Sequence, residues 1–161
     1  MINAGQLAEA FASNLDILKM QTKGLTHQDS LLQPPVRGNC LNWVLGHITV
    51  NRDRVLSILG EAPILSPGVT ARYQTDSEPV TCEQEGILSL AELIDALERG
   101  QGLLSAALQR ASEAELAREV QVGETSLSIR QRLFGLYFHE TYHTGQTELL
   151  RQLAGTNDKI I

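Results

Sequence analysis

Residues 128–154 read SIRQRLFGLYFHETYHTGQTELLRQLA, and this stretch decides the fold of the chain. Ser128 and Gln131 form a capping box, in which each side chain satisfies a backbone donor at the start of a helix. Gly155 follows as a C-terminal cap. The sequence therefore predicts one long helix from Ser128 to about Ala154.

This helix carries two histidines, His139 and His143. Residues four apart project from one face of a helix in adjacent turns, so the two imidazoles can chelate one metal ion. The chain has only 4 His, which makes a spaced pair more informative than a lone histidine. We therefore take both residues as candidate metal ligands.

A catalytic metal site normally has three protein ligands, so a third is needed. His47 lies in the apolar run Trp43–Ile48 at the centre of another predicted helix, where an unsatisfied imidazole costs free energy. A metal ion would satisfy it, and so would a backbone carbonyl or a carboxylate. We predict a divalent metal on His47, His139 and His143, and we expect His27, in a loop-like segment, to be solvent-exposed.

Three more long helices are predicted upstream. The first covers Ala4–Gln21, with one apolar stripe. The second covers Leu41–Leu59, with Asn39 as its candidate cap and Gly60 as its stop. The third begins with a capping box at Ser89 and Glu92.

Shorter elements and connections are also readable. A short helix is expected within residues 26–36 and another at the Ser112 capping box. Residues 61–88 hold several Pro, Gly, Ser and Thr, which predicts a long loop between the second and third helices. Gly46 would let another element approach the second helix closely. No convincing strand pattern is present.

These elements predict an all-α fold, a four-helix bundle forming a single domain over residues 1–161. The net charge of -6 argues against nucleic acid as a partner. No apolar run approaches the length that spans a membrane. No signal peptide is recognisable, and the isolated Cys40 and Cys82 suit a reducing compartment, so we expect a cytoplasmic protein.

The combination of two short motifs resembles the DinB/YfiT-like superfamily of metalloenzymes. The matching residues are Trp43, Leu45, Gly46, His47 and Ile48 in one helix, then His139, His143, Gly145 and Gln146 in the last. The resemblance implies a four-helix bundle, a metal triad at the three histidines, and a homodimer. It also implies a small-molecule substrate, with low-molecular-weight thiols as co-substrates in some relatives.

Two other metal sites fit the last helix less well. The run His139–His143 also satisfies H-E-x-x-H, the zinc protease helix, with Glu140 as its base. No histidine follows within the remaining residues to complete that site. A di-iron centre would need a second E-x-x-H element, but Val44 stands three residues before His47.

The resulting hypothesis is a metal-dependent enzyme acting on a small molecule, either a thiol-dependent S-transferase or a hydrolase. Imidazole ligands suit Zn or Ni first, with Fe and Cu as alternatives. Gln146, Asn51 and Glu140 are candidate catalytic residues, and Tyr142 and Arg132 are weaker ones. The alternative is a non-catalytic, dimeric helical binding protein with a structural or vestigial metal site.

Overall fold

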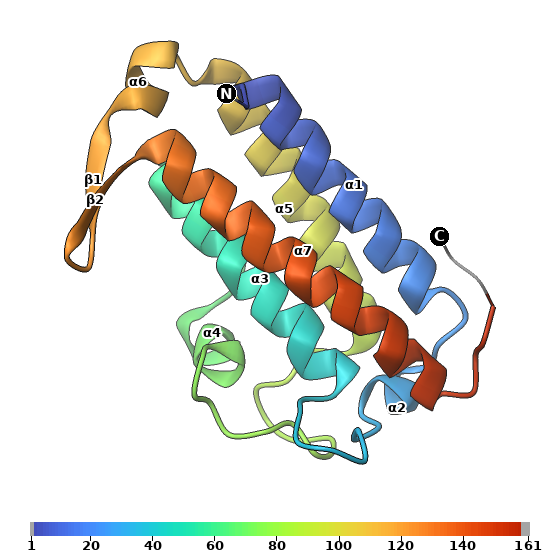
Figure 1. The fold of residues 1–161 in the computed structure, drawn as a ribbon. Helices are drawn as coiled ribbons and strands as arrows, with labels where there is room; N and C mark the ends of the chain where they lie inside the picture. The colour runs from blue at the N-terminus through green and yellow to red at the C-terminus, as the bar shows by residue number, and fades with distance from the viewer. Residues whose placement is uncertain (1, 159–161) are drawn as a thin grey trace.

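The computed structural model describes residues 2–158, and four long helices run the length of the molecule (Figure 1). They are α1 (Ala4–Thr22), α3 (Leu41–Ile58), α5 (Leu90–Arg110) and α7 (Ile129–Leu153). Three short helices and one hairpin complete the fold: α2 (His27–Ser30), α4 (Pro67–Tyr73), α6 (Glu113–Ala117), β1 (Glu119–Val122) and β2 (Thr125–Ser128). The predicted all-α four-helix bundle is confirmed.

The four long helices form a ring in which α1 and α3 lie on opposite corners. Each of these two helices packs against both α5 and α7. Helices α3 and α5 run in the same direction, so the chain must travel back along the bundle between them (Figure 1). This return explains the long connection over residues 61–88, since parallel neighbours in a bundle need a crossover.

The helix boundaries follow the caps that the sequence predicts. Capping boxes begin α5, α6 and α7, and the glycines at 60 and 155 adopt positive φ at the ends of α3 and α7. One predicted cap is wrong: Cys40, not Asn39, is the N-cap of α3, and its side chain makes no capping hydrogen bond.

Two short elements differ from the prediction. The 61–88 connection is not entirely loop, because Pro67 opens the helix α4 within it. Residues 119–128 form an antiparallel hairpin, although no strand was predicted. Gly123 takes φ 59° at the first turn position, which the two-residue turn requires. Four-residue strands leave too short an alternation to recognise in the sequence.

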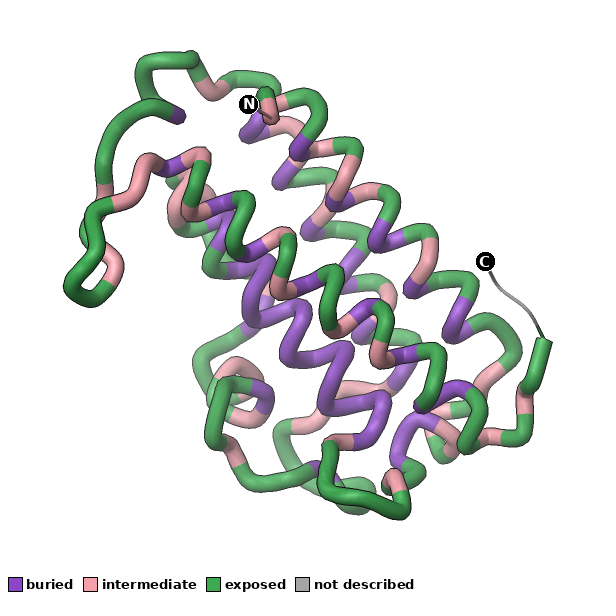
Figure 2. Tube along the Cα trace, viewed as in Figure 1, coloured by how far each residue is buried: buried purple, intermediate pink, exposed green. Residues whose placement is uncertain are grey.

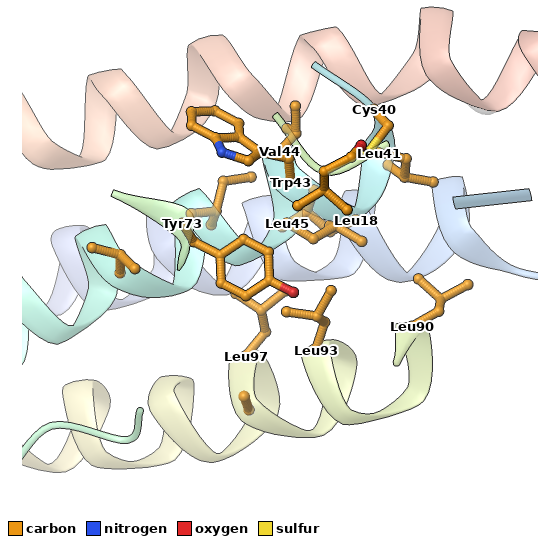
Figure 3. Packing of buried hydrophobic residues seen from close by; sticks show 14 of the residues in the cluster. Leu18, Cys40, Leu41, Trp43, Val44, Leu45, Tyr73, Leu90, Leu93 and Leu97 are labelled. Atoms are coloured by element: carbon orange, nitrogen blue, oxygen red, sulfur yellow. Dashed lines mark hydrogen bonds between the residues drawn. The ribbon is translucent and has the colours of Figure 1, made fainter. Parts of the chain in front are cut away.

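Helix α3 is buried without interruption from Leu41 to Asp53, whereas the other long helices alternate between buried and exposed residues (Figure 2). The crossover covers its outer face. The Tyr73 ring at the end of α4 lies so close to Gly46 that a Cβ there would overlap it. Tyr73 belongs to the same apolar cluster as Leu93 and Leu97 of α5 (Figure 3). The predicted close approach at Gly46 is therefore confirmed, and the approaching element is α4.

A buried ion pair lies between the two apolar clusters of the core. Arg52 is fully buried and donates from Nε and Nη2 to the two Glu140 carboxylate oxygens, at 2.9 and 2.8 Å. It also donates to the carbonyl oxygens of Leu97 and Phe11 and to the Gln101 side chain. One guanidinium thus joins all four long helices.

No helix within residues 2–158 is both long and apolar enough to cross a bilayer.

Candidate metal centre

Three histidine rings converge between α3 and α7. The ring centroids of His47 lie 5.2 Å from His139 and 5.0 Å from His143, and those of His139 and His143 lie 4.6 Å apart. One nitrogen from each ring lies within 4.8 Å of the others. The structure therefore brings together the three residues that the sequence predicted, from positions 92 residues apart in the chain.

His47 is held by two neighbours. Its Nδ1 donates to the backbone carbonyl of Tyr73 at 2.8 Å. Its ring stacks on Trp43, one helical turn earlier, with centroids 4.7 Å apart and an interplanar angle of 9°. Trp43 is itself fixed, because its Nε1 donates to Ser77 at 2.9 Å. The crossover and α3 together fix the orientation of this imidazole.

His143 is oriented by Gln146, whose amide oxygen lies 2.9 Å from the ring Nδ1. The two residues are three apart on α7 and so lie on one face. His139 differs, since its Nδ1 is buried and has no hydrogen-bond partner among residues 2–158. Its Nε2 lies 3.4 Å from Nε2 of His47.

This arrangement fits a cation. The Nδ1 atoms of His47 and His143 each face an oxygen acceptor, so they carry the ring proton and leave the Nε2 lone pairs free. The 3.4 Å between the Nε2 atoms of His47 and His139 matches the separation of about 3.3 Å between two imidazole ligands of one tetrahedral ion. The three histidines are thus a group that could hold a metal ion.

All three rings are biased towards the neutral form, which is the form that binds metal. Burial lowers the pKa of His47 to about 4, against the raising effect of the Tyr73 carbonyl. Burial is also the main cause that lowers the pKa of His139 and of His143. The charges of Arg54 and Arg132 lower the pKa of His139 further.

The exposure of the histidine group would allow a substrate to reach a bound ion. His139 and His143 are only partly buried, so the group is reachable from solvent. Three neutral ligands would leave a bound divalent ion its full charge, able to polarise a substrate oxygen or to lower the pKa of a thiol. The protein's own contribution is to fix the rings: a backbone carbonyl and an aromatic face at His47, and an amide at His143.

The other candidate residues are placed differently. Asn51 is buried and donates to the His47 backbone carbonyl at 2.9 Å, so it supports the helix and contacts no imidazole ring by hydrogen bond. Glu140 turns into the core to pair with Arg52 and does not join the histidine group. The ring of Tyr142 packs edge-on against His143, and most of this side chain is exposed.

His27 is not a solvent-exposed loop residue as predicted. It is the first residue of α2 and is partly buried. Its Nε2 contacts Glu83 at 2.5 Å, and its Nδ1 accepts from the Leu90 backbone at 3.3 Å. These contacts join α2 to the crossover and to α5, and His27 does not belong to the group of the other three histidines.

Sequence reasoning missed the two residues that fix His47. Trp43 precedes His47 by four positions, so the i,i+4 spacing could have indicated their contact. Tyr73 gave no such signal, because it acts through a backbone carbonyl that every residue possesses.

A histidine inside one bundle helix, facing an i,i+4 histidine pair on another, defines a class of helical proteins with a histidine-lined centre. The sequence matches the family model of the DinB superfamily over residues 10–147. The chain therefore belongs to the DinB superfamily.

The fold has a close counterpart among solved structures. The crystal structure of a conserved protein from Enterococcus faecalis is similar with a TM-score of 0.75, covering 97% of this chain and 100% of that one. The two chains share 18% sequence identity, so the similarity concerns the fold alone. The search of curated proteins returned no significant match.

Proposed function

We propose that this chain is a divalent-metal-dependent enzyme acting on a small molecule, with one ion on His47, His139 and His143. The observation that carries the proposal is the convergence of three neutral imidazoles, two of which present bare Nε2 atoms. Zn and Ni are the first candidates for the metal, followed by Fe and Cu.

The proposed reaction is thiol-dependent S-transfer or hydrolysis. Both reactions use a nucleophile whose pKa must fall towards neutrality, and both suit a cation with neutral ligands. A low-molecular-weight thiol is the expected co-substrate for the transferase. Cys40 and Cys82 are unpaired, which is consistent with a thiol-rich, reducing cytoplasm.

Metal analysis of a matched pair of variants tests the ligand set. His143→Ala should abolish stoichiometric metal binding while keeping the helix content, measured by elemental analysis and circular dichroism. His27→Ala is the control, because His27 lies outside the group. Full metal occupancy in His143→Ala would show that the ligand assignment is wrong. Metal-dependent turnover in a panel of thiols, electrophiles and esters would then support catalysis.

A second candidate is a non-catalytic dimeric binding protein with a structural metal site. The observation that favours it is a stripe of exposed apolar side chains along α7, namely Phe134, Phe138, Tyr142, Leu149 and Leu153. Such a stripe on a surface helix is typical of a contact with another protein. We propose that this face forms the homodimer in either case.

The dimer is tested by light scattering on the double variant Phe138→Ser/Leu149→Ser, whose side chains are each 66% exposed in the chain. We expect this variant to be monomeric, because it removes apolar area from the middle of the stripe. Leu103→Ser on α5, another exposed leucine, should leave the oligomeric state unchanged. A double variant that stays dimeric would contradict the use of this face.

A further inference from the structure

A cavity of about 980 Å³ lies between α3, α4, the hairpin and the start of α7, and none of the three histidines lines it. Its walls come from the outer side of α3, from α4 and the segment before it, from the hairpin, and from the first turn of α7. The hairpin and α4 lie on the same side of the bundle (Figure 1). The hairpin and the residue before it, Arg118, thus form one wall of the cavity. The sequence did not predict this hairpin.

The cavity has a positive lining in a protein of net charge -6. Arg54, Arg118 and Arg132 all line it. The acidic residue among the lining residues is Asp53, which is buried and already accepts hydrogen bonds from the backbone of Ile64 and Leu65. The lining therefore offers cationic donors and no free carboxylate.

Two of these arginines have donors to spare. Within residues 2–158, the guanidinium groups of Arg118 and Arg132 form no hydrogen bond and no ion pair with another side chain or backbone group. Arg54 uses one nitrogen to donate to Asn51 at 2.9 Å. Arginine presents five N–H donors in a planar fork that matches carboxylate and phosphate oxygens. Arg118 and Arg132 therefore keep donors that a ligand in the cavity could use, although the Arg118 charge also acts on the nearby Glu115, whose pKa is lowered chiefly by backbone hydrogen bonding and further by this charge.

The arginines are aligned with the candidate metal ligands. Arg54 follows His47 by seven residues on α3, and Arg132 precedes His139 by seven residues on α7. Seven residues are two helical turns, so each pair shares a face, with about 10 Å between the residues along the axis. Because α3 and α7 are antiparallel, both arginines lie towards the same end of the bundle (Figure 1).

We propose that this cavity binds an oxyanion of the substrate, a carboxylate or a phosphate, through Arg54, Arg118 and Arg132. The inference rests on the proposed function and narrows it: the substrate is an anionic small molecule. Its charged end lies in the arginine-lined cavity, and its reacting group lies about two helical turns away, at the histidines. The hairpin then has a role, since it brings Arg118 to the cavity.

Binding of small anions to metal-free protein tests the proposal without any dependence on the metal. The protein is stripped with a chelator, dialysed, and titrated calorimetrically with succinate, with inorganic phosphate, and with succinamide as the uncharged analogue. We expect saturable binding of at least one anion and none of succinamide. Arg118→Met and Arg132→Met should each weaken anion binding about tenfold, because each removes a charged hydrogen-bond donor. Arg99→Met, which removes an exposed arginine paired with Asp95 on α5, should bind like the wild type.

Three results would overturn the inference: no saturable binding of either anion, equal binding of succinamide, or unchanged affinity in both cavity variants. Circular dichroism of Arg118→Met checks folding, and this exposed position is the variant least able to disturb the core. Metal content of the same variants separates the two proposals. Anion binding in a protein that takes up no metal would contradict the proposed function alone, and metal binding without anion binding would contradict this inference alone.

Discussion

In two of the three histidines, a hydrogen bond to one ring nitrogen orients the other nitrogen. Nδ1 of His47 donates to the backbone carbonyl of Tyr73, and Nδ1 of His143 faces the amide oxygen of Gln146. Such contacts fix the tautomer and direct the other nitrogen to the metal. His139 lacks one, so its ring is held by packing and by its neighbours in the group.

Proton release on metal binding follows from the lowered histidine pKa values. A lowered pKa means that the proton leaves at lower pH, so each ring is more than half neutral at pH 6.5, the ordinary pKa of histidine. Three unperturbed histidines would release about 1.5 protons at that pH. We expect fewer here, with metal affinity falling as the pH drops below 6.5 and the His139 and His143 rings protonate, and lost as the pH approaches the pKa of about 4 for His47.

Calorimetry at pH 6.5 in two buffers of different ionisation enthalpy measures the number of protons released. Release of the full number expected for unperturbed rings would mean that burial does not hold them neutral. A titration of His143→Ala under the same conditions gives the baseline without the complete group.

At the residue scale, the sequence predicts which histidines come together, but it does not predict the residues that orient them. The i,i+4 spacing of His139 and His143 and the apolar surroundings of His47 can be recognised from the sequence alone. The Tyr73 carbonyl cannot, because its role depends on where the crossover lies. Glu140 shows the opposite problem, since H-E-x-x-H suggests a base and the structure pairs it with Arg52.

Sequence patterns do not predict α4, which holds His47 through the Tyr73 carbonyl, or the hairpin, which lines the cavity. Helix α4 has only 7 residues and each strand of the hairpin has 4, so neither carries enough periodicity to be recognised. The four long helices repeat their apolar pattern over several turns, and the predicted starts of all four and the predicted ends of α1, α3 and α7 lie within one residue of the structure. Short elements owe their structure to packing on the bundle, which a local pattern does not contain.

Helix α4 packs against α3 at Gly46, and this contact positions the Tyr73 carbonyl that accepts from His47. A methyl group at this position would overlap the Tyr73 ring and displace the residue whose carbonyl holds His47. We expect Gly46→Ala to destabilise the protein by about 1–3 kcal/mol through overpacking, despite the better helix propensity of alanine. Its metal affinity should fall as well.

The matched control is Gly102→Ala, in α5, where an added Cβ meets nothing within 4 Å. Helix propensity alone should stabilise that variant by about 1 kcal/mol. Urea unfolding of both proteins measures the two effects, which have opposite signs. Stabilisation by Gly46→Ala would mean that α4 moves away without cost and does not support His47.

At the scale of the whole molecule, Arg52 connects every long helix. Its five hydrogen bonds reach α1, α5 and α7 from α3, between the two apolar clusters. In the sequence it stands in the polar run Asn51–Arg54, which resembles an exposed turn of helix. Nothing in that run signals burial, because burial here comes from three helices that are distant in the chain.

Removing one partner of the Arg52–Glu140 ion pair should lower the free energy of unfolding far more than removing both. We expect Glu140→Ala to lose about 3–5 kcal/mol of unfolding free energy, because it leaves a buried guanidinium without its counter-charge. The double variant Arg52→Met/Glu140→Leu should lose much less, since an apolar pair replaces both charges. Glu98→Ala, which breaks the exposed pair with Lys19, should cost less than about 1 kcal/mol. Urea denaturation of metal-free protein gives all three values on one scale.

A further substitution at Glu140 distinguishes a structural role of this residue from a catalytic one. If Glu140 served as a base, Glu140→Gln would abolish any metal-dependent turnover while leaving the unfolding free energy nearly unchanged, because the amide keeps the shape of the carboxylate. The ion pair predicts the reverse. Glu140→Gln removes the counter-charge of a fully buried Arg52, so it should lower stability markedly, and the folded fraction should keep its metal and its turnover per folded molecule. Measuring activity at a temperature where the variant is fully folded separates the two roles, and a stable but inactive Glu140→Gln would place Glu140 in the reaction after all.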